Sequence, residues 1–135
     1  MKKNNQLFIG RSLLKKMGKF IPVGNYSKIG ILTDEIIARH WLQVIERGLG
    51  KKVIPIIIPP GEKMKTINQV IEIWKRMMNE GFDRHSLLIN LGGGVIGDIG
   101  GFAASTFMRG IDFINIPTTL LAMVDASIGG KTGID

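Results

Sequence analysis

The sequence of 135 residues contains no cysteine, which excludes disulfide bonds, thiolate nucleophiles and cysteine-ligated zinc. It also has no apolar run close to the roughly 20 residues that a membrane-spanning helix needs. Lys2 and Lys3 are not followed by a long apolar stretch, so the start of the chain does not resemble a signal peptide. We therefore expect a cytoplasmic protein with no membrane partner.

Acidic residues are absent from the first 33 positions, which hold seven lysines and arginines. The remaining positions hold eleven residues of each sign, so the net charge of +7 comes from the first quarter. Such a run is typical of a solvated helix face or a charged tail, and alternatively of a surface that attracts anionic substrates. Because there is one tyrosine and no aromatic interleaving, we do not expect a nucleic-acid partner.

Strand-like and helix-like patterns alternate along the chain, which indicates an α/β fold. We expect a Rossmann-like, largely parallel sheet with flanking helices. Apolar runs predict strands at 6–10, 28–33, 53–58, 86–91 and 111–116. Helical spacing predicts helices at 11–20, from Asp34 to the glycines at 48 and 50, at 66–78, at 95–107, and after Pro117-Thr118-Thr119.

Local signals mark where these helices begin and end. Asp34 stands where an N-cap belongs, Thr66 and Gln69 match a capping box, and Gly81 is a C-terminal stop. The helix at 95–107 contains three glycines, each of which costs about 1 kcal/mol relative to alanine. We therefore expect another helix or a ligand to approach its backbone closely.

A glycine-rich turn joins the strand at 86–91 to the next helix. Gly92, Gly94 and Gly97 match the spacing G-x-G-x-x-G, and Gly93 lies between the first two. Glycines let the backbone approach a pyrophosphate, and a helix N-terminus offers free N–H groups to it. In a standard dinucleotide fold this turn follows the first strand, whereas here earlier strands precede it. A nucleotide phosphate site and a tight turn with close helix packing both remain open.

Charged residues that interrupt apolar stretches are further candidates. Asp98 and Asp125 should each pair, cap a helix or bind a ligand, because an unpaired buried carboxylate is costly. Arg109 fits an ion pair or an anion ligand. Lys131, in a glycine-rich loop, suits a phosphate or carboxylate, or faces solvent, but the spacing around it excludes a Walker A loop.

Polar residues of two other kinds can also serve a ligand. Thr118 and Thr119 fit a helix N-cap or hydroxyl donors to a ligand. His40 and His85 are the only histidines, and they do not stand at metal-ligand spacing. The sequence therefore predicts no metal ligand in this chain.

Taken together, these segments resemble the dehydroquinate synthase family. The resemblance is carried by 92–110 and 116–133, and more weakly by Pro60-Gly-Glu-Lys-Met-Lys65. It implies that 1–135 is the family's NAD-binding α/β domain, cut short at its C-terminal end. It also implies a reaction that converts 3-deoxy-D-arabino-heptulosonate 7-phosphate, a sugar phosphate, into 3-dehydroquinate and phosphate in the shikimate pathway.

The resemblance assigns a role to each matching residue. It places Asp125, Lys131 and Arg109 at the substrate, with Arg109 able to reach across a dimer interface. Pro60 stands where the family has an aspartate, which puts that contact in doubt. The positions that match NAD contacts are Asp34, Glu62, Lys65, Gly92, Gly93, Gly94, Asp98, Thr118 and Thr119.

Length is the main departure from the family, whose members are more than twice as long. The family's zinc or cobalt ligands belong to a helical C-terminal domain that this chain lacks. We therefore expect the chain to be inactive alone, and the full-length enzyme to be a homodimer. Alternatives are another sugar-phosphate cyclase, such as an inosose synthase, an iron-type alcohol or glycerol dehydrogenase, or a non-catalytic nucleotide-binding remnant.

Overall fold

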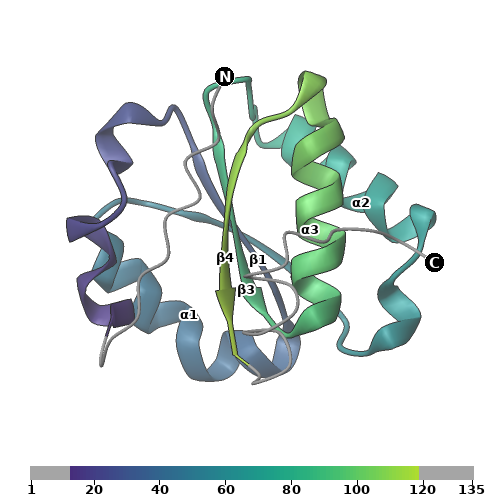
Figure 1. Ribbon diagram of the computed structural model, residues 1–135, viewed down its shortest axis with the longest axis horizontal. Helices are drawn as coiled ribbons and strands as arrows, with labels where there is room; N and C mark the ends of the chain where they lie inside the picture. The colour runs from purple at the N-terminus through teal and green to yellow at the C-terminus, as the bar shows by residue number, and fades with distance from the viewer. Residues whose placement is uncertain (1–12, 119–135) are drawn as a thin grey trace.

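The computed structural model describes residues 13–118, which form a parallel sheet flanked by helices (Figure 1). The sheet has four strands in the order β2-β1-β3-β4, and every neighbouring pair is parallel. This confirms the predicted Rossmann-like architecture. The strands are β1 (Ile29–Asp34), β2 (Ile54–Ile58), β3 (Leu87–Gly92) and β4 (Asp112–Pro117). The helices are α1 (Glu35–Leu49), α2 (Ile67–Asn79) and α3 (Gly94–Thr106). Short 3-10 helices are η1 (Leu13–Lys19), η2 (Val23–Asn25), η3 (Glu62–Met64) and η4 (Phe107–Arg109).

The helix caps confirm some of the signals read from the sequence. The Asp34 carboxylate accepts hydrogen bonds from the backbone N–H groups of Ile36 and Ile37, both at 2.9 Å, and so begins α1. The Thr66 hydroxyl accepts from the N–H of Gln69 at the start of α2, but the Thr66 N–H donates to the Met64 carbonyl at 2.9 Å, so only half of the predicted capping box forms. Gly50 follows α1 with a φ of +65°, a left-handed conformation that favours glycine. Gly48, predicted to help end α1, lies inside it.

Helices cover both faces of the sheet because successive side chains of a buried parallel strand point to opposite faces. On one face, Leu32 and Leu88 pack in a core with α2 and α3. On the other, Ile31 and Ile89 pack in a second core with α1 and η1. Figure 1 shows α2 and α3 together on one side of the strands and α1 on the other. Within residues 13–118 no helix has the length and apolar character to cross a membrane.

The elements predicted near the two ends of the chain are not confirmed. The predicted helix at 11–20 is wrong in type, because residues 13–19 form η1, which is interrupted at Lys16. Its backbone lies directly against α1, where a Cβ at Gly48 would overlap the Leu14 carbonyl oxygen. The strand expected at 6–10 and the helix expected after Thr119 lie outside the described residues.

Side-chain hydrogen bonds connect the segments at the amino-terminal edge of the sheet. The Tyr26 hydroxyl donates to Asp112 at the start of β4 at 3.0 Å. The Ser27 hydroxyl donates to Asp83 and lies 3.2 Å from the Ser86 hydroxyl. These contacts join the segment before β1 to the segments that precede β3 and β4.

The Tyr26–Asp112 contact predicts a loss of stability in alkali. Burial, the hydrogen bond to Asp112 and the negative charge of Asp112 raise the pKa of Tyr26 to about 12, from an ordinary value of 10.0. The folded state therefore holds the phenol proton more tightly than the unfolded state. The contribution of Tyr26 to the free energy of unfolding is fully present below pH 10 and is lost as the pH rises toward 12. Urea denaturation across this range should show the loss, and Tyr26→Phe should remove this component; an equal pH slope in both proteins would contradict the assignment.

Candidate active site

The carboxyl ends of the strands bring most of the predicted cofactor residues to one edge of the sheet. Asp34 ends β1, Glu62 follows β2, Gly92 ends β3 and Thr118 follows β4. From β1 the chain runs through α1 to β2 on one side, and β3 lies on the other side of β1. In open α/β sheets, ligands bind at such a topological switch point. This edge is therefore the candidate site.

The glycine turn confirms the predicted strand–turn–helix context. Gly93 is the N-cap of α3 and provides no side-chain hydrogen bond, and the N–H of Gly97 donates to the Gly93 carbonyl at 3.1 Å. The first N–H groups of α3 thus point out of the helix without intrahelical acceptors. They lie at the positive end of the helix dipole, which favours an anion.

The glycines of this turn serve different purposes. A Cβ at Gly92 would lie 2.7 Å from the Ile96 Cβ, so packing within the protein requires glycine there. A Cβ at Gly94 would meet nothing within 4 Å. The missing side chain of Gly94 therefore leaves open space beside the helix N-terminus. Of these two glycines, Gly94 is the one where a ligand can use that space.

Asp98 and Lys65 form an ion pair beside this turn. Asp98 follows Gly94 by four residues on α3, so the two share a helix face. The Lys65 ammonium group lies 3.1 Å from the Asp98 carboxylate, and both side chains are about one-fifth exposed, at 19% and 22%. Of the three outcomes expected for Asp98, which were pairing, capping a helix and binding a ligand, the structure shows pairing. Lys65 directly follows η3, so the pair joins the loop after β2 to α3.

The other predicted cofactor residues occupy the rim of this edge. One oxygen of the half-buried Asp34 carboxylate is used by the α1 cap. Glu62 is exposed in η3, directly after Gly61, whose φ is +115°. Thr118 is exposed, and its N–H donates to the Gly92 carbonyl at 3.0 Å. Thr119, Asp125 and Lys131 lie outside the described residues.

Arg109 lies away from these residues, at the opposite edge of the sheet. It ends η4, which follows the C-terminal end of α3, and it precedes β4. The 13 residues of α3 separate it from the glycine turn by about 20 Å. Met108, Arg109 and Gly110 have positive φ values of 47°, 68° and 105°. Within one chain, the structure does not bring Arg109 to the predicted cofactor residues.

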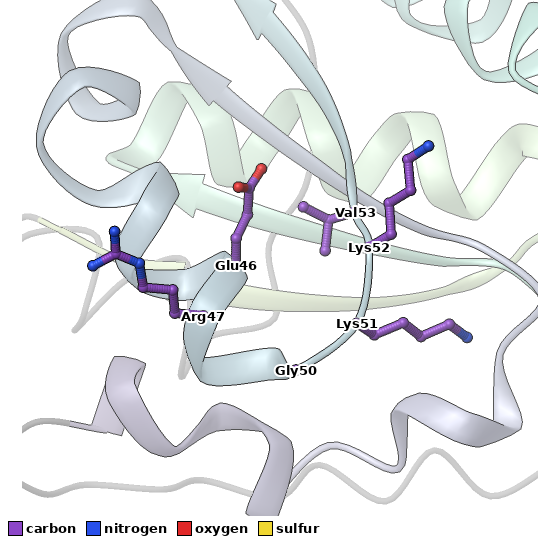
Figure 2. A pocket seen from close by; sticks show the side chains of 6 residues that line it. All are labelled: Glu46, Arg47, Gly50, Lys51, Lys52 and Val53. Atoms are coloured by element: carbon purple, nitrogen blue, oxygen red, sulfur yellow. The ribbon is translucent and has the colours of Figure 1, made fainter.

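Other features of the described part do not form a second convergent site. In residues 13–118 no three His, Cys, Asp or Glu side chains cluster as metal ligands. A surface hollow of about 530 Å³ lies beside the end of α1 and the start of β2. Figure 2 shows the Arg47 and Lys51 side chains at this hollow pointing in opposite directions. The Lys51 ammonium group donates to the carbonyls of Val23 and Tyr26, so it holds the chain before β1.

Comparison with known families covers the glycine turn and the strands on either side of it. The model of the family described as 3-dehydroquinate synthase N-terminal matches residues 55–135. The chain belongs to the 3-dehydroquinate synthase family. The resemblance stated from the sequence is thus confirmed. The match includes Glu62, Lys65, the glycine turn and Asp98.

Individual relatives agree with this assignment. A 3-dehydroquinate synthase from Pyrococcus abyssi is 52% identical over 124 residues, which cover 92% of this chain and 37% of the relative. One from Alkaliphilus metalliredigens is 45% identical over 133 residues, with 96% and 36% covered. The chain therefore spans little more than a third of the length of these relatives.

Solved structures show the same fold. A 2-deoxy-scyllo-inosose synthase matches 84% of this chain and 33% of its own, with a TM-score of 0.78 and 27% identity. The 2-epi-5-epi-valiolone synthase ValA from Streptomyces hygroscopicus, solved with NAD+ and Zn2+, matches 84% and 33%, with a TM-score of 0.72 and 33% identity. An iron-containing alcohol dehydrogenase, at 20% identity and a TM-score of 0.68, shares the fold alone.

Proposed function

We propose that this chain is the NAD-binding portion of a 3-dehydroquinate synthase. The whole protein would convert 3-deoxy-D-arabino-heptulosonate 7-phosphate into 3-dehydroquinate and phosphate. The observation that carries the proposal is the open space at Gly94, at the N-terminus of α3 and at the switch point of the sheet. A related cyclase structure, ValA, contains NAD+, which supports this choice of ligand.

The described residues fit a dinucleotide. The N–H groups at the start of α3 suit the pyrophosphate, and Gly94 leaves room for it. The Lys65–Asp98 pair, one helical turn farther along α3, offers a cation and a carboxylate to a ribose hydroxyl. The second carboxylate oxygen of Asp34 offers an acceptor to the other ribose. When bound, NAD supplies a hydride acceptor and donor.

The remaining parts of the reaction lie beyond these residues. We propose that Asp125 and Lys131 contact the sugar-phosphate substrate, where the ammonium group suits a phosphate or carboxylate. Because Arg109 lies at the far edge of the sheet, we propose that it acts in the site of a second copy of the chain in a homodimer. The zinc or cobalt ion would take its ligands from outside this chain. We also propose that the whole protein is cytoplasmic.

Another sugar-phosphate cyclase is the second candidate. The fold likeness to 2-deoxy-scyllo-inosose synthase favours it, because one of that enzyme's structures holds carbaglucose-6-phosphate, NAD+ and Co2+. Its identity to this chain is 28%, against 52% for the Pyrococcus abyssi relative. Both candidates predict the same NAD site, so they differ in the sugar phosphate that the whole protein converts.

Substitution of Gly94 tests the proposed NAD site. Gly94→Val places a branched side chain in the open space and should weaken NAD binding at least about tenfold, a loss of about 1.4 kcal/mol. Gly24→Val is the matched control, because a Cβ at Gly24 also meets nothing within 4 Å but lies at the other edge of the sheet, in η2. Calorimetric titration of the 135-residue chain with NAD, at fixed salt, measures both.

Three results are informative in this titration. Weaker binding by Gly94→Val with unchanged binding by Gly24→Val would support the proposal. Equal affinity of all three proteins for NAD would show that the pyrophosphate does not bind beside Gly94. If the unsubstituted chain is folded by circular dichroism and binds no NAD, the chain would not by itself form the site, and the non-catalytic remnant would become the better reading.

A further inference from the structure

A buried hydroxyl joins the ends of the two strands that flank the switch point. Thr33, the penultimate residue of β1, is fully buried, with 0% exposure. Its hydroxyl donates to the Leu91 carbonyl of β3 at 2.7 Å. The two residues are 58 positions apart in the sequence. No local pattern in the sequence singles out Thr33.

This bond lies where the backbone ladder between the strands stops. The β1–β3 register ends at Leu32 and Asn90. The β1–β2 register continues to Asp34 and Ile58, and the β3–β4 register continues to Gly92 and Pro117. Just past the last paired residues, Leu32 and Asn90, the Thr33 hydroxyl therefore adds a side-chain hydrogen bond between β1 and β3.

The residues that follow on each strand belong to the proposed NAD site. Asp34 comes directly after Thr33, and Gly92 comes directly after Leu91. On its other side, the Gly92 carbonyl accepts the Thr118 N–H at 3.0 Å. Two successive peptide groups that enter the glycine turn are thus held, the first from β1 by a side chain and the second from the end of β4 by the backbone.

We propose that Thr33 is a positioning residue for the NAD site, acting through Leu91 on the glycine turn. This inference rests on the proposed function. The hydroxyl fixes the separation between the Asp34 carboxylate and the N–H groups at the start of α3. A binding site needs its groups held within about 0.5 Å of the productive geometry, so a looser turn binds the dinucleotide less tightly. Thr33 itself touches no ligand.

Two substitutions separate this role from simple packing. Thr33→Val keeps the branched shape and removes the hydroxyl, which leaves the buried Leu91 carbonyl without this donor. Thr33→Ser keeps the hydroxyl and removes the methyl group, which leaves a small cavity. Both variants lose stability, so stability alone does not distinguish them. Only the valine variant loses the bond that positions the turn.

Calorimetric titration with NAD is the first readout, at a temperature where circular dichroism shows all proteins folded. We expect the dissociation constant to rise about tenfold in Thr33→Val, which corresponds to one hydrogen bond, and to stay within about twofold in Thr33→Ser. Unchanged affinity in the valine variant would overturn the inference. An equal loss in the serine variant would also overturn it, because the hydroxyl would then not be the cause.

Amide hydrogen exchange is the second readout, and it does not require NAD. The Thr118 N–H, bonded to the Gly92 carbonyl, should exchange faster in Thr33→Val than in the parent and Thr33→Ser, after normalisation to amides of α2. If the parent chain binds no NAD, the proposed function fails in this chain while the exchange result still decides whether Thr33 positions the turn. Equal normalised exchange in all three proteins would reject that role.

Discussion

Gly100→Ala is expected to destabilise the protein by at least about 3 kcal/mol, the upper part of the usual range for overpacking a core. The added Cβ would overlap the side-chain oxygen of Asn90, which projects from β3 against α3. Asn90 is buried, at 1% exposure, and its amide nitrogen donates to the Asn115 side chain on β4 at 3.0 Å. The asparagine cannot turn away without breaking that bond or displacing the core.

Alanine's better helix propensity does not compensate for this overlap. It contributes about 1 kcal/mol relative to glycine in a helix interior, less than the expected cost of the clash. Gly94→Ala is the matched control on the same helix, because its Cβ meets nothing within 4 Å. Urea denaturation should show a large loss for Gly100→Ala and no loss for Gly94→Ala.

A double substitution tests the physical cause. Asn90→Ala removes the overlapping atom, so the combination with Gly100→Ala should be more stable than the two separate losses predict. We expect a coupling free energy of about 2 kcal/mol, within the range measured for residues in contact. Additive losses would show that Gly100 is required for a reason other than the Asn90 side chain.

The contact between Gly100 and Asn90 shows how much of the packing can be predicted from the sequence. Glycine spacing predicted that something approaches the α3 backbone, and it offered another helix or a ligand. At Gly100 the close approach is confirmed, but the expected kind of neighbour is wrong, because the neighbour is Asn90 of β3, a strand under the helix. The glycines of α3 indicate that some group contacts the helix backbone closely. Which group this is depends on how α3 crosses the sheet. Among residues 13–118 the side-chain oxygen of Asn90 has no hydrogen-bond partner, which fits its close packing against the Gly100 backbone.

The site shows a similar division. Strand ends, the glycine turn and the Asp34 cap are local signals, and each was predicted from neighbouring residues. The sequence suggested separate cofactor roles for Lys65 and Asp98, but their mutual ion pair depends on the loop after β2 meeting α3. Thr33 was missed because its acceptor becomes a neighbour only through the strand order β2-β1-β3-β4. Local pattern made Arg109 a candidate for an ion pair or an anion ligand, and the family resemblance placed it at the substrate, but neither indicated the distance that separates it from the turn.

Gly48→Ala is the second substitution with a large expected effect. Its Cβ would overlap the Leu14 carbonyl oxygen and lie 3.0 Å from the Leu14 carbonyl carbon, so η1 would have to move away from α1. Both atoms belong to the backbone, so no rotamer change relieves the overlap. Gly18 repeats the contact from the other side, with a Cβ 3.1 Å from the Gly48 and Leu49 carbonyl oxygens.

The expected loss is at least about 3 kcal/mol, and it should be concentrated at the start of the described chain. Displacing η1 exposes Met17 and Ile21, which are buried in the core beneath α1. Hydrogen exchange should therefore rise over residues 13–21 more than in β3, whereas Gly100→Ala should affect β3 and α3. Gly24→Ala, where a Cβ has open space, should leave exchange in both regions unchanged. Uniform loss of protection from hydrogen exchange in Gly48→Ala would mean that η1 and the sheet unfold as one unit. The contact that Gly48 permits would then stabilise the whole domain and not only η1.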